Sequence, residues 1–264
     1  KKNQYFLEDI NTEFNQIKLT SPSLLIKKKK DLFLISGKIL SNENDFNVKL
    51  LNNLFKDNFQ NLKIENIRFS SNNDFTFNVN KNLKISDFNL KSIINLNNLD
   101  YKNDLFKIKN YLPNFDELIK LTNHKILINY NKNQLDINGK GEILIEDKLD
   151  TLDYKITKKK EQYFFDTNID INKNPLILDV LDYKKRKNVN SLISLNGIYK
   201  KNKQIKFNLI SFKENKNEFL IKNLQLNNKL KIINIDLLDL NYRNNNKIQN
   251  QIYLKKNKKN YEIK

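Results

Sequence analysis

Hydrophobic and polar residues alternate along most of this chain. Between residues 135 and 145, apolar side chains and glycines occupy the odd positions, while Asp136, Asn138, Lys140 and Glu142 occupy even ones. Successive side chains of a β-strand point to opposite faces, so this pattern predicts strands with one apolar and one polar face. Such strands are typical of antiparallel sheets, and the sequence therefore predicts an all-β, mainly antiparallel fold.

The clearest alternating stretches supply a candidate apolar surface. Their apolar members keep a common phase within each stretch, so we expect them to share one face of the sheet. The residues expected to line this face are Leu135, Ile137, Ile143, Ile145, Phe165, Ile169, Ile171, Phe207 and Leu209.

The alternation shifts by one residue in two places. Phe219 and Ile221 are out of step with Leu224 and Leu226, and the same shift occurs within the segment 83–90. A shift of this kind predicts either a β-bulge, which inserts one residue, or a bend that re-aims the strand.

Short polar segments separate the alternating stretches and are expected to be turns. Because the chain has only 4 glycines, we expect asparagine to supply most of the left-handed turn positions. Regular strands joined by short turns predict a meander rather than βαβ units. The expected turns are 71–74, 158–161, 202–203, 215–217 and 244–246.

Helix-like patterns are confined to a few segments. Phe46–Phe59 places leucine and phenylalanine at helical spacing, and Pro113–Leu121 begins with proline and carries two acidic residues in its first turn. A shorter turn is expected at Leu176–Leu181, after a proline. We therefore predict one or two short helices in an otherwise stranded chain.

The chain is strongly basic, with 48 Lys and Arg against 30 Asp and Glu and a formal net charge of +18. One interpretation is a basic surface for a polyanion; the other is compositional drift, since the abundant Asn, Lys and Ile are typical of an AT-biased genome. The basic runs lie at expected turns with few aromatic residues, unlike single-stranded nucleic-acid sites. Nucleic acid is therefore not the expected partner, whereas attraction to anionic lipid headgroups is compatible with these runs.

Few residues of this chain suit catalysis or metal binding. No cysteine is present, which excludes disulfides and thiolate chemistry. The single histidine, His124, is expected at the surface near a strand entrance, and Asp147, Asp150 and Asp153 are expected to be solvated turn residues. We predict no catalytic residue, no metal site and no cofactor.

No stretch approaches the ~18–20 apolar residues that a membrane-spanning helix requires. No signal peptide is visible in the first 30 residues, and the chain begins at Lys1 and contains no methionine. We expect residues 1–264 to be one continuous section of a longer protein, with a possible sub-boundary near 110–121. Any membrane anchor would precede this section.

From about Pro113 to Lys264 the chain resembles the AsmA-like superfamily of bacterial envelope proteins, especially its YhdP-like and TamB-like members. The resemblance is one of pattern and spacing. It is carried by Gly139–Ile145, Leu152–Ile156, Tyr163–Ile171, Leu181–Lys184, Leu195–Ile198, Leu230–Asp236 and Tyr261–Ile263.

This resemblance implies a periplasmic protein anchored in the inner membrane by a segment outside the present sequence. It implies an elongated, curved, taco-like β-groove that conducts phospholipid acyl chains towards the outer membrane, with envelope protein partners at its ends. The few glycines and the high lysine content depart from the usual pattern of the family.

Other functions remain open at this point. A closed β-solenoid or sandwich could serve as a ligand-free structural or interaction segment of an envelope protein, and a polyanion-binding module or an enzyme are further alternatives. An uncovered apolar face favours lipid conduction, whereas a packed core favours the structural segment.

Overall fold

A computed structural model describes residues 3–14, 17–46, 48–49, 63–102, 118–144, 148–201, 203–258 and 260–264. The chain divides into two compact units. Unit 1 comprises Lys1–Lys102 and Lys120–Gly139, and unit 2 comprises Asn103–Ile119 and Lys140–Lys264.

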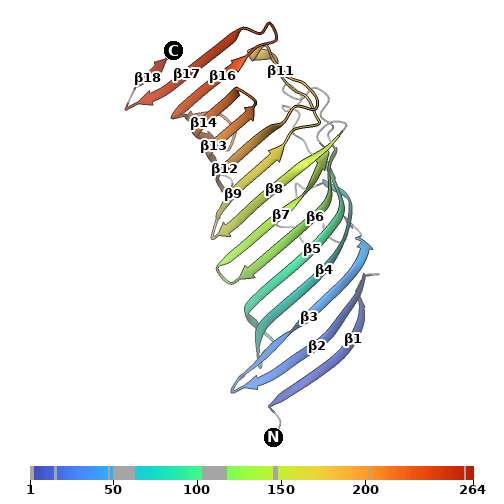
Figure 1. Cartoon of the computed structure of the whole chain (residues 1–264). Coiled ribbons are helices and arrows are strands. Elements are labelled where there is room, and N and C mark those ends of the chain that lie inside the picture. The colour runs from blue at the N-terminus through green and yellow to red at the C-terminus, as the bar shows by residue number, and fades with distance from the viewer. Residues whose placement is uncertain are drawn as a thin grey trace. The chain divides into compact units, whose positions relative to one another are not determined.

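The strands follow chain order in a single 16-stranded sheet, which begins with β1 and ends with β18 (Figure 1). Every strand pair whose register is described is antiparallel. The expected all-β, mainly antiparallel meander is therefore confirmed.

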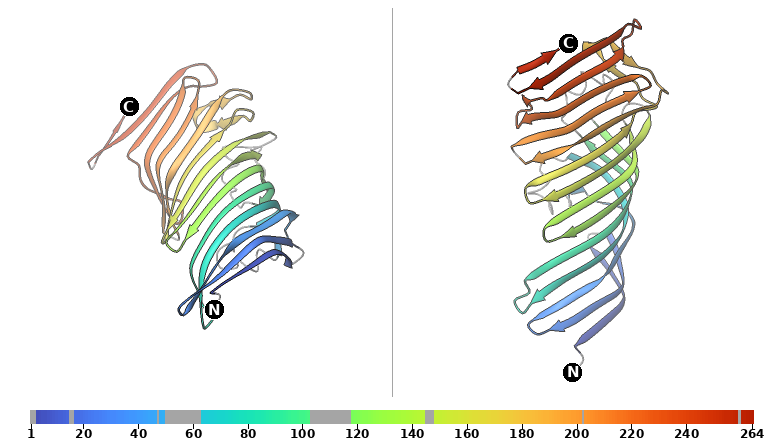
Figure 2. Two further views of the ribbon diagram at one scale, coloured as in Figure 1. Left: turned by 60° about the horizontal axis from the view of Figure 1, so that its bottom comes forward. Right: turned by 60° about the vertical axis from the view of Figure 1, so that its left-hand side comes forward.

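Unit 1 contains the longest strands, and neighbouring strands lie side by side in each view (Figure 2). Its strands are β1 (Gln4–Phe14), β2 (Ile17–Lys29), β3 (Leu32–Asp45), β4 (Lys63–Asn80), β5 (Ile85–Lys102) and most of β6 (Leu118–Asn131); β7 (Gln134–Leu144) runs from one unit into the other.

Unit 2 contains shorter strands and one separate hairpin. Its part of the sheet consists of β8 (Leu149–Lys159), β9 (Gln162–Asp170), β12 (Ser191–Lys200), β13 (Gln204–Glu214), β14 (Asn217–Asn227), β15 (Ile232–Asn234), β16 (Leu237–Arg243), β17 (Gln249–Asn257) and β18 (Asn260–Ile263). The hairpin comprises β10 (Leu176–Leu178), the 3₁₀ turn η2 (Asp179–Leu181) and β11 (Tyr183–Lys185), and forms its own two-stranded sheet. We call residues 176–185 the cap hairpin.

Helix plays almost no part in the residues that the structure describes. Most of the expected helix Phe46–Phe59 lies outside the described residues. Of the part that is described, only Val48 and Lys49 are helical. The expected helix Pro113–Leu121 is wrong at its end, because β6 begins at Leu118; its earlier residues lie outside the described part. The expected turn at Leu176–Leu181 corresponds to β10 followed by η2.

The two expected shifts of phase both coincide with a left-handed residue. Asn223 in β14 and Asp87 in β5 have positive φ values of 53° and 52°, and each immediately precedes the residue at which the apolar phase resumes. At Asp87 the pairing of β4 with β5 also shifts, so this irregularity is a bulge, whereas β14 keeps its register with β13 across Asn223. Asp9 and Asn123 adopt the same left-handed conformation inside β1 and β6, because aspartate and asparagine tolerate it better than most residues.

The expectation that asparagine dominates the left-handed positions is wrong. Lysine occupies them as often as asparagine, for example at the β8–β9 turn, where Lys160 has a φ of 54°. None of the glycines has a positive φ. Exposed hairpin turns tolerate the strain of a left-handed lysine, so glycine is not required at these turns.

The expected turn at 71–74 is also wrong, because these residues lie inside β4. Their polar side chains are accommodated by hydrogen bonds across strands. Asn73 Nδ2 donates to the carbonyl oxygen of Ile39 in β3 at 3.1 Å, and Ser92 Oγ in β5 donates to Asn73 Oδ1 at 2.5 Å. Cross-strand partners thus allow a polar segment to remain a strand.

Gly197 is required by close packing rather than by backbone conformation. A Cβ atom at this position would lie 2.1 Å from the carbonyl oxygen of Lys206 and 2.8 Å from Cζ of Phe165. The pairing of β12 with β13 shifts at Asn196/Gly197, so the partner strand crowds this point. Glycine here permits the close approach of the neighbouring strand.

We predict that Gly197→Ala lowers the free energy of unfolding by about 2–3 kcal/mol, because the backbone must move to admit the methyl group. Asn196→Ala is the control, since it changes the adjacent residue on the opposite face. Urea unfolding of both variants provides the measurement. Equal stability of the two variants would contradict the packing described for Gly197.

Candidate functional site

The register of unit 2 aligns its apolar side chains in rows that cross the strands. Paired residues on neighbouring strands lie on the same face, so each row follows from the pairings. The Phe165 row comprises Ile156, Phe165, Gly197, Phe207 and Leu224. The Ile169 row comprises Leu152, Ile169, Ile193, Phe212, Phe219 and Leu240. We call the surface formed by both rows the apolar face of unit 2.

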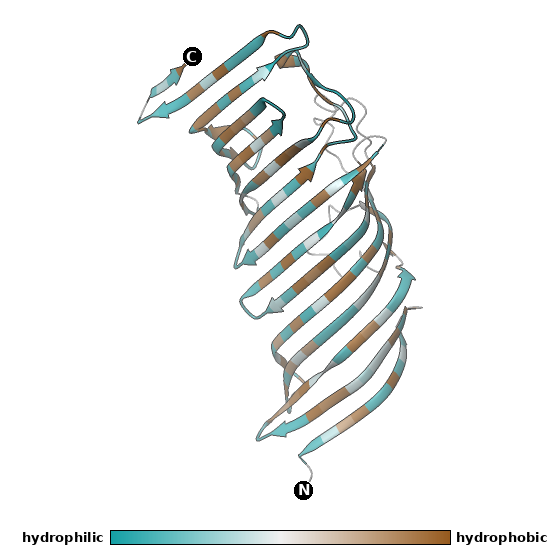
Figure 3. Ribbon diagram, viewed as in Figure 1, coloured by the Kyte–Doolittle hydropathy of each residue, from teal (hydrophilic) through white to brown (hydrophobic). Residues whose placement is uncertain are grey.

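The opposite face of unit 2 is mostly polar. Asp166 is paired with Lys155 on one side and with Asn196 on the other. This alternation of apolar and polar positions is visible as banding along the strands (Figure 3). The sheet therefore presents two chemically different surfaces from one backbone.

Coverage differs between the two rows. In the Ile169 row, Phe212, Phe219 and Leu240 are buried, whereas Leu152 and Ile169 remain half-buried. In the Phe165 row, the large side chains are all half-buried, and Phe165 and Phe207 meet edge to face with ring centroids 5.7 Å apart. Much of this apolar face is therefore accessible within the described residues.

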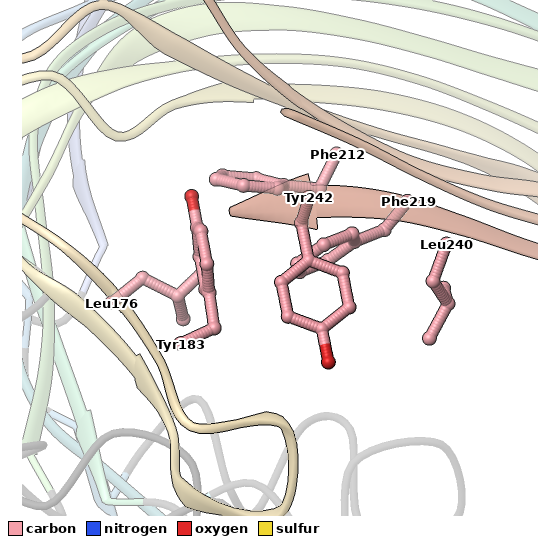
Figure 4. Packing of buried hydrophobic residues seen from close by; sticks show 6 residues of the cluster. All are labelled: Leu176, Tyr183, Phe212, Phe219, Leu240 and Tyr242. Carbon is pink, nitrogen blue, oxygen red and sulfur yellow. The ribbon is translucent and has the colours of Figure 1, made fainter. Parts of the chain in front are cut away.

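The cap hairpin covers one end of the Ile169 row. Its Leu176 and Tyr183 lie against Phe212, Phe219 and Tyr242, as Figure 4 shows. The ring of Tyr183 packs edge to face on that of Phe219 with centroids 5.0 Å apart. Aromatic contacts of this geometry stabilise packing beyond simple burial, so this end of the face is a closed core.

Buried polar groups anchor the segment that leads into the cap hairpin. Asp150, which is 3% exposed, accepts hydrogen bonds from the backbone N–H groups of Asn172 and Lys173 at 3.1 and 3.0 Å and from Asn174 Nδ2 at 2.7 Å. The expectation that Asp150 is a solvated turn residue is wrong. Its carboxylate instead organises a loop whose backbone donors would otherwise be buried without acceptors.

Lys185 extends the same network from the cap hairpin. Its side chain is fully buried, and Nζ donates to the carbonyl oxygens of Asn174 at 2.6 Å and Arg186 at 3.0 Å. Burial lowers the pKa of Lys185, while the charges of Asp150 and Glu214 oppose that shift. These contacts make Lys185 an anchor of the cap rather than an accessible amine.

Tyr183 joins the aromatic cluster to a buried acid. Its hydroxyl donates a hydrogen bond to the carboxylate of Glu214, which also accepts one from Asn217 Nδ2 at 2.9 Å. Burial raises the pKa of the Tyr183 hydroxyl, and the hydrogen bond and charge of Glu214 raise it further. The cap is thus held by both packing and a satisfied polar network.

Unit 1 carries an apolar face of its own, which we define by the paired or contacting residues Ile35, Phe77, Phe75, Leu90, Phe88 and Tyr130. Phe77 and Phe88 have ring centroids 6.2 Å apart. Nearby, Ile10, Leu19, Leu24 and Ile39 help to line a small depression of about 170 Å³.

A hydrogen-bonded polar ladder crosses β3, β4 and β5 within unit 1. Ser41 and Ser71 are 2.9 Å apart between their hydroxyl oxygens, and the ladder continues through Asn73 to Ser92. Ser41 and Ser92 are buried. These small side chains satisfy one another, so the ladder fixes strand register without leaving polar atoms unpaired.

The residues predicted to share a face are only partly brought together. Phe165, Phe207 and Ile169 lie on the apolar face of unit 2, and Ile171 is buried immediately after β9. The common phase expected for Leu209 is wrong, because the register shift in β13 pairs it with Asn196 on the polar face.

The remaining predicted residues belong to β7 and its end. Leu135, Ile137 and Ile143 occupy alternate positions of this strand, in which no residue has a positive φ, so they point to one side of it. Ile145 lies outside the described residues.

Sequence reasoning also misplaced His124. It is 1% exposed in the middle of β6, not at the surface. Asn123 precedes it with a φ of 54°, and from His124 onwards the less exposed side chains of β6 fall on even positions, with Ile126 and Ile128. The Asn123-His124 pair interrupts the alternation, and this interruption was the feature of the sequence that could have indicated a buried histidine.

Across the described ranges, no group of acidic or histidine side chains is arranged to hold a metal ion. No helix in the same ranges is long and apolar enough to cross a membrane. Comparison with known proteins finds no matching family model, curated protein or solved structure.

We predict that Tyr183→Phe destabilises the protein by about 1–3 kcal/mol near pH 7, since buried Glu214 loses its hydroxyl donor. The folded-state pKa of Tyr183 is raised, so its stabilising contribution is complete below the ordinary tyrosine pKa of about 10 and is lost as pH rises above it. Urea unfolding at pH 7 and pH 11 should show the difference between the two proteins shrinking by about 1.4 kcal/mol. A pH-independent difference would contradict this role.

Proposed function

We propose that this protein is a section of an envelope bridge that binds phospholipid acyl chains on its apolar faces and passes them towards the outer membrane. The observation that carries the proposal is the Phe165 row, in which four of five neighbouring strands contribute a large apolar side chain that remains half-buried; they are Ile156, Phe165, Phe207 and Leu224. An apolar surface of this extent requires a cover, and an acyl chain is a suitable one.

The energetics of acyl transfer support this proposal. Each methylene group removed from water contributes about 0.8 kcal/mol, so a chain of about 16 carbons gains on the order of 12 kcal/mol before entropic costs. A row of apolar side chains can retain most of that gain while a chain moves along it. Isolated pockets would require the chain to re-enter water between them.

The resemblance to AsmA-like proteins supports the setting of this proposal. It implies a location in the periplasm, an anchor in the inner membrane outside this sequence and protein partners at the ends, and the proposal adopts that setting. Within this proposal, phospholipid is the cargo and the polar face is the solvent-facing wall.

A ligand-free structural segment is the second candidate, and the cap hairpin favours it. Phe212, Phe219 and Leu240 are buried by the cap, as in an ordinary core. If the cap hairpin covered the whole apolar face of unit 2, no surface would remain for lipid. Because the Phe165 row is only half-buried, we infer that the cap hairpin covers only one part of the apolar face.

Native mass spectrometry of the purified protein tests the proposed function. Protein recovered from cells without added detergent should carry phospholipid adducts with masses of two-chain lipids. Protein that is free of lipid, and that binds no fluorescent phospholipid in solution, would overturn the proposal.

Ile169→Asp should produce a folded protein that no longer binds fluorescent phospholipid. Ile169 is half-buried, so the carboxylate can reach water when no lipid is present, but acyl chains would have to desolvate it. Thermal unfolding and lipid binding are measured together. If the variant is folded and binds lipid normally, Ile169 does not belong to the lipid-binding face.

Two controls accompany this variant. Asn168→Asp introduces the same group on the exposed polar face and should leave lipid binding unchanged. Phe212→Asp places it beneath the cap and should cost several kcal/mol of stability, because the charge is buried without a partner. Outright unfolding of Ile169→Asp would favour the ligand-free core.

A further inference from the structure

The cap hairpin has two chemically different sides. Leu176 is paired with Lys185 and Leu178 with Tyr183, and these side chains face the packed cluster and its anchoring network. Ile177 is paired with Lys184 between them, so these two residues point to the other side. The outer side of the cap therefore combines an apolar residue with a cation.

A cavity of about 610 Å³ opens on this outer side. Pro175 and Ile177 provide its apolar part, and three exposed cations surround them. Among the described lining residues there is no carboxylate; they are Pro175, Ile177, Lys184, Arg186, Lys187 and Asn245.

An acidic residue, Asp182, is hydrogen-bonded to the asparagine that lines this cavity. Asp182 accepts hydrogen bonds from Asn245 Nδ2 at 2.8 Å and from Asn246 Nδ2 at 3.3 Å. The backbone N–H of Asn245 also donates to the carbonyl oxygen of Asp182 at 2.8 Å. These contacts position Asn245 at the cavity and occupy the carboxylate with amide donors.

We propose that this cavity binds the phosphate of an anionic phospholipid headgroup, with Lys184, Arg186 and Lys187 as its cationic contacts. The inference rests on the proposed function and adds a preference for lipid charge. A guanidinium offers paired donors that match a phosphate, and the lysines add compact positive charge. The floor formed by Pro175 and Ile177 suits the glycerol and ester portion of a lipid, which free phosphate lacks.

The two sides of the cap hairpin therefore have separate roles. Its inner side closes the core at one end of the Ile169 row, and its outer side supplies charge for the headgroup. An anionic phospholipid should bind more tightly than diacylglycerol with identical acyl chains, because diacylglycerol has no phosphate to contact the cations.

The test compares fluorescent phosphatidylglycerol and diacylglycerol binding to the full chain at low ionic strength. Lys184→Gln, Arg186→Gln and Lys187→Gln are combined in one variant. Each basic group near an anionic lipid surface strengthens binding by about fivefold, so phosphatidylglycerol affinity should fall on the order of 100-fold while diacylglycerol binding stays constant. The substitutions are at exposed positions, and circular dichroism checks that the fold is retained.

A matched variant removes the same charge elsewhere in unit 2. Lys159, Lys201 and Lys203 are exposed at the β8–β9 and β12–β13 turns, and their replacement by glutamine should weaken phosphatidylglycerol binding by less than about threefold. Equal losses in the two triple variants would show general charge attraction and overturn the site.

The remaining outcomes separate this inference from the proposed function. If diacylglycerol binds but the cap variant keeps its affinity for phosphatidylglycerol, the headgroup site is wrong and acyl binding stands. If inorganic phosphate alone binds the wild type as tightly as phosphatidylglycerol does, the site takes free phosphate and not a headgroup. If the wild type binds neither lipid, the proposed function fails together with the inference.

Discussion

The antiparallel hydrogen-bond register is the constraint on which the rest of the structure depends. The pairings of unit 2 place Phe165 opposite Gly197 and Gly197 opposite Phe207, so that these positions share a single face. A slip of one residue would move that row to the polar side, where Asp166 and Asn196 lie. The apolar face is therefore a property of register, and the left-handed residues Asn223 and Asp87 stand at two points where the sequence changes phase.

The cap hairpin shows what the same sheet does when its apolar face is covered. Beneath Tyr183, the aromatic side chains of Phe212 and Phe219 are buried as in a compact domain, and Lys185 and Glu214 are held by specific partners. Away from the cap, the residues of the Phe165 row stay half-buried. One strand, β13, therefore takes part in both a closed core and an accessible face, and this contrast separates structural positions from candidate lipid-binding positions.

Local alternation predicted the fold class and much of the apolar face, because the period of a strand is set by its backbone alone. It placed Phe165, Ile169 and Phe207 correctly on one face. It failed at Leu209, because Leu209 and Ile210 are both apolar and only the pairing with β12 shows which of them lies on the apolar face. It also failed at Asp150, His124 and the polar ladder, where burial depends on contacts between residues far apart in the chain. Tertiary partners of this kind cannot be deduced from spacing.

The most direct test of the central claim, that acyl chains lie on the apolar face, uses two adjacent residues of β9. Phe165 lies on the apolar face, and Phe164 points to the opposite one. A photoreactive p-benzoylphenylalanine is placed at each position in turn, cells are irradiated, and adducts on the purified protein are identified by mass spectrometry. The account predicts phospholipid adducts at position 165 and few or none at position 164. Equal labelling at the two positions, or no lipid adduct at position 165, would contradict it.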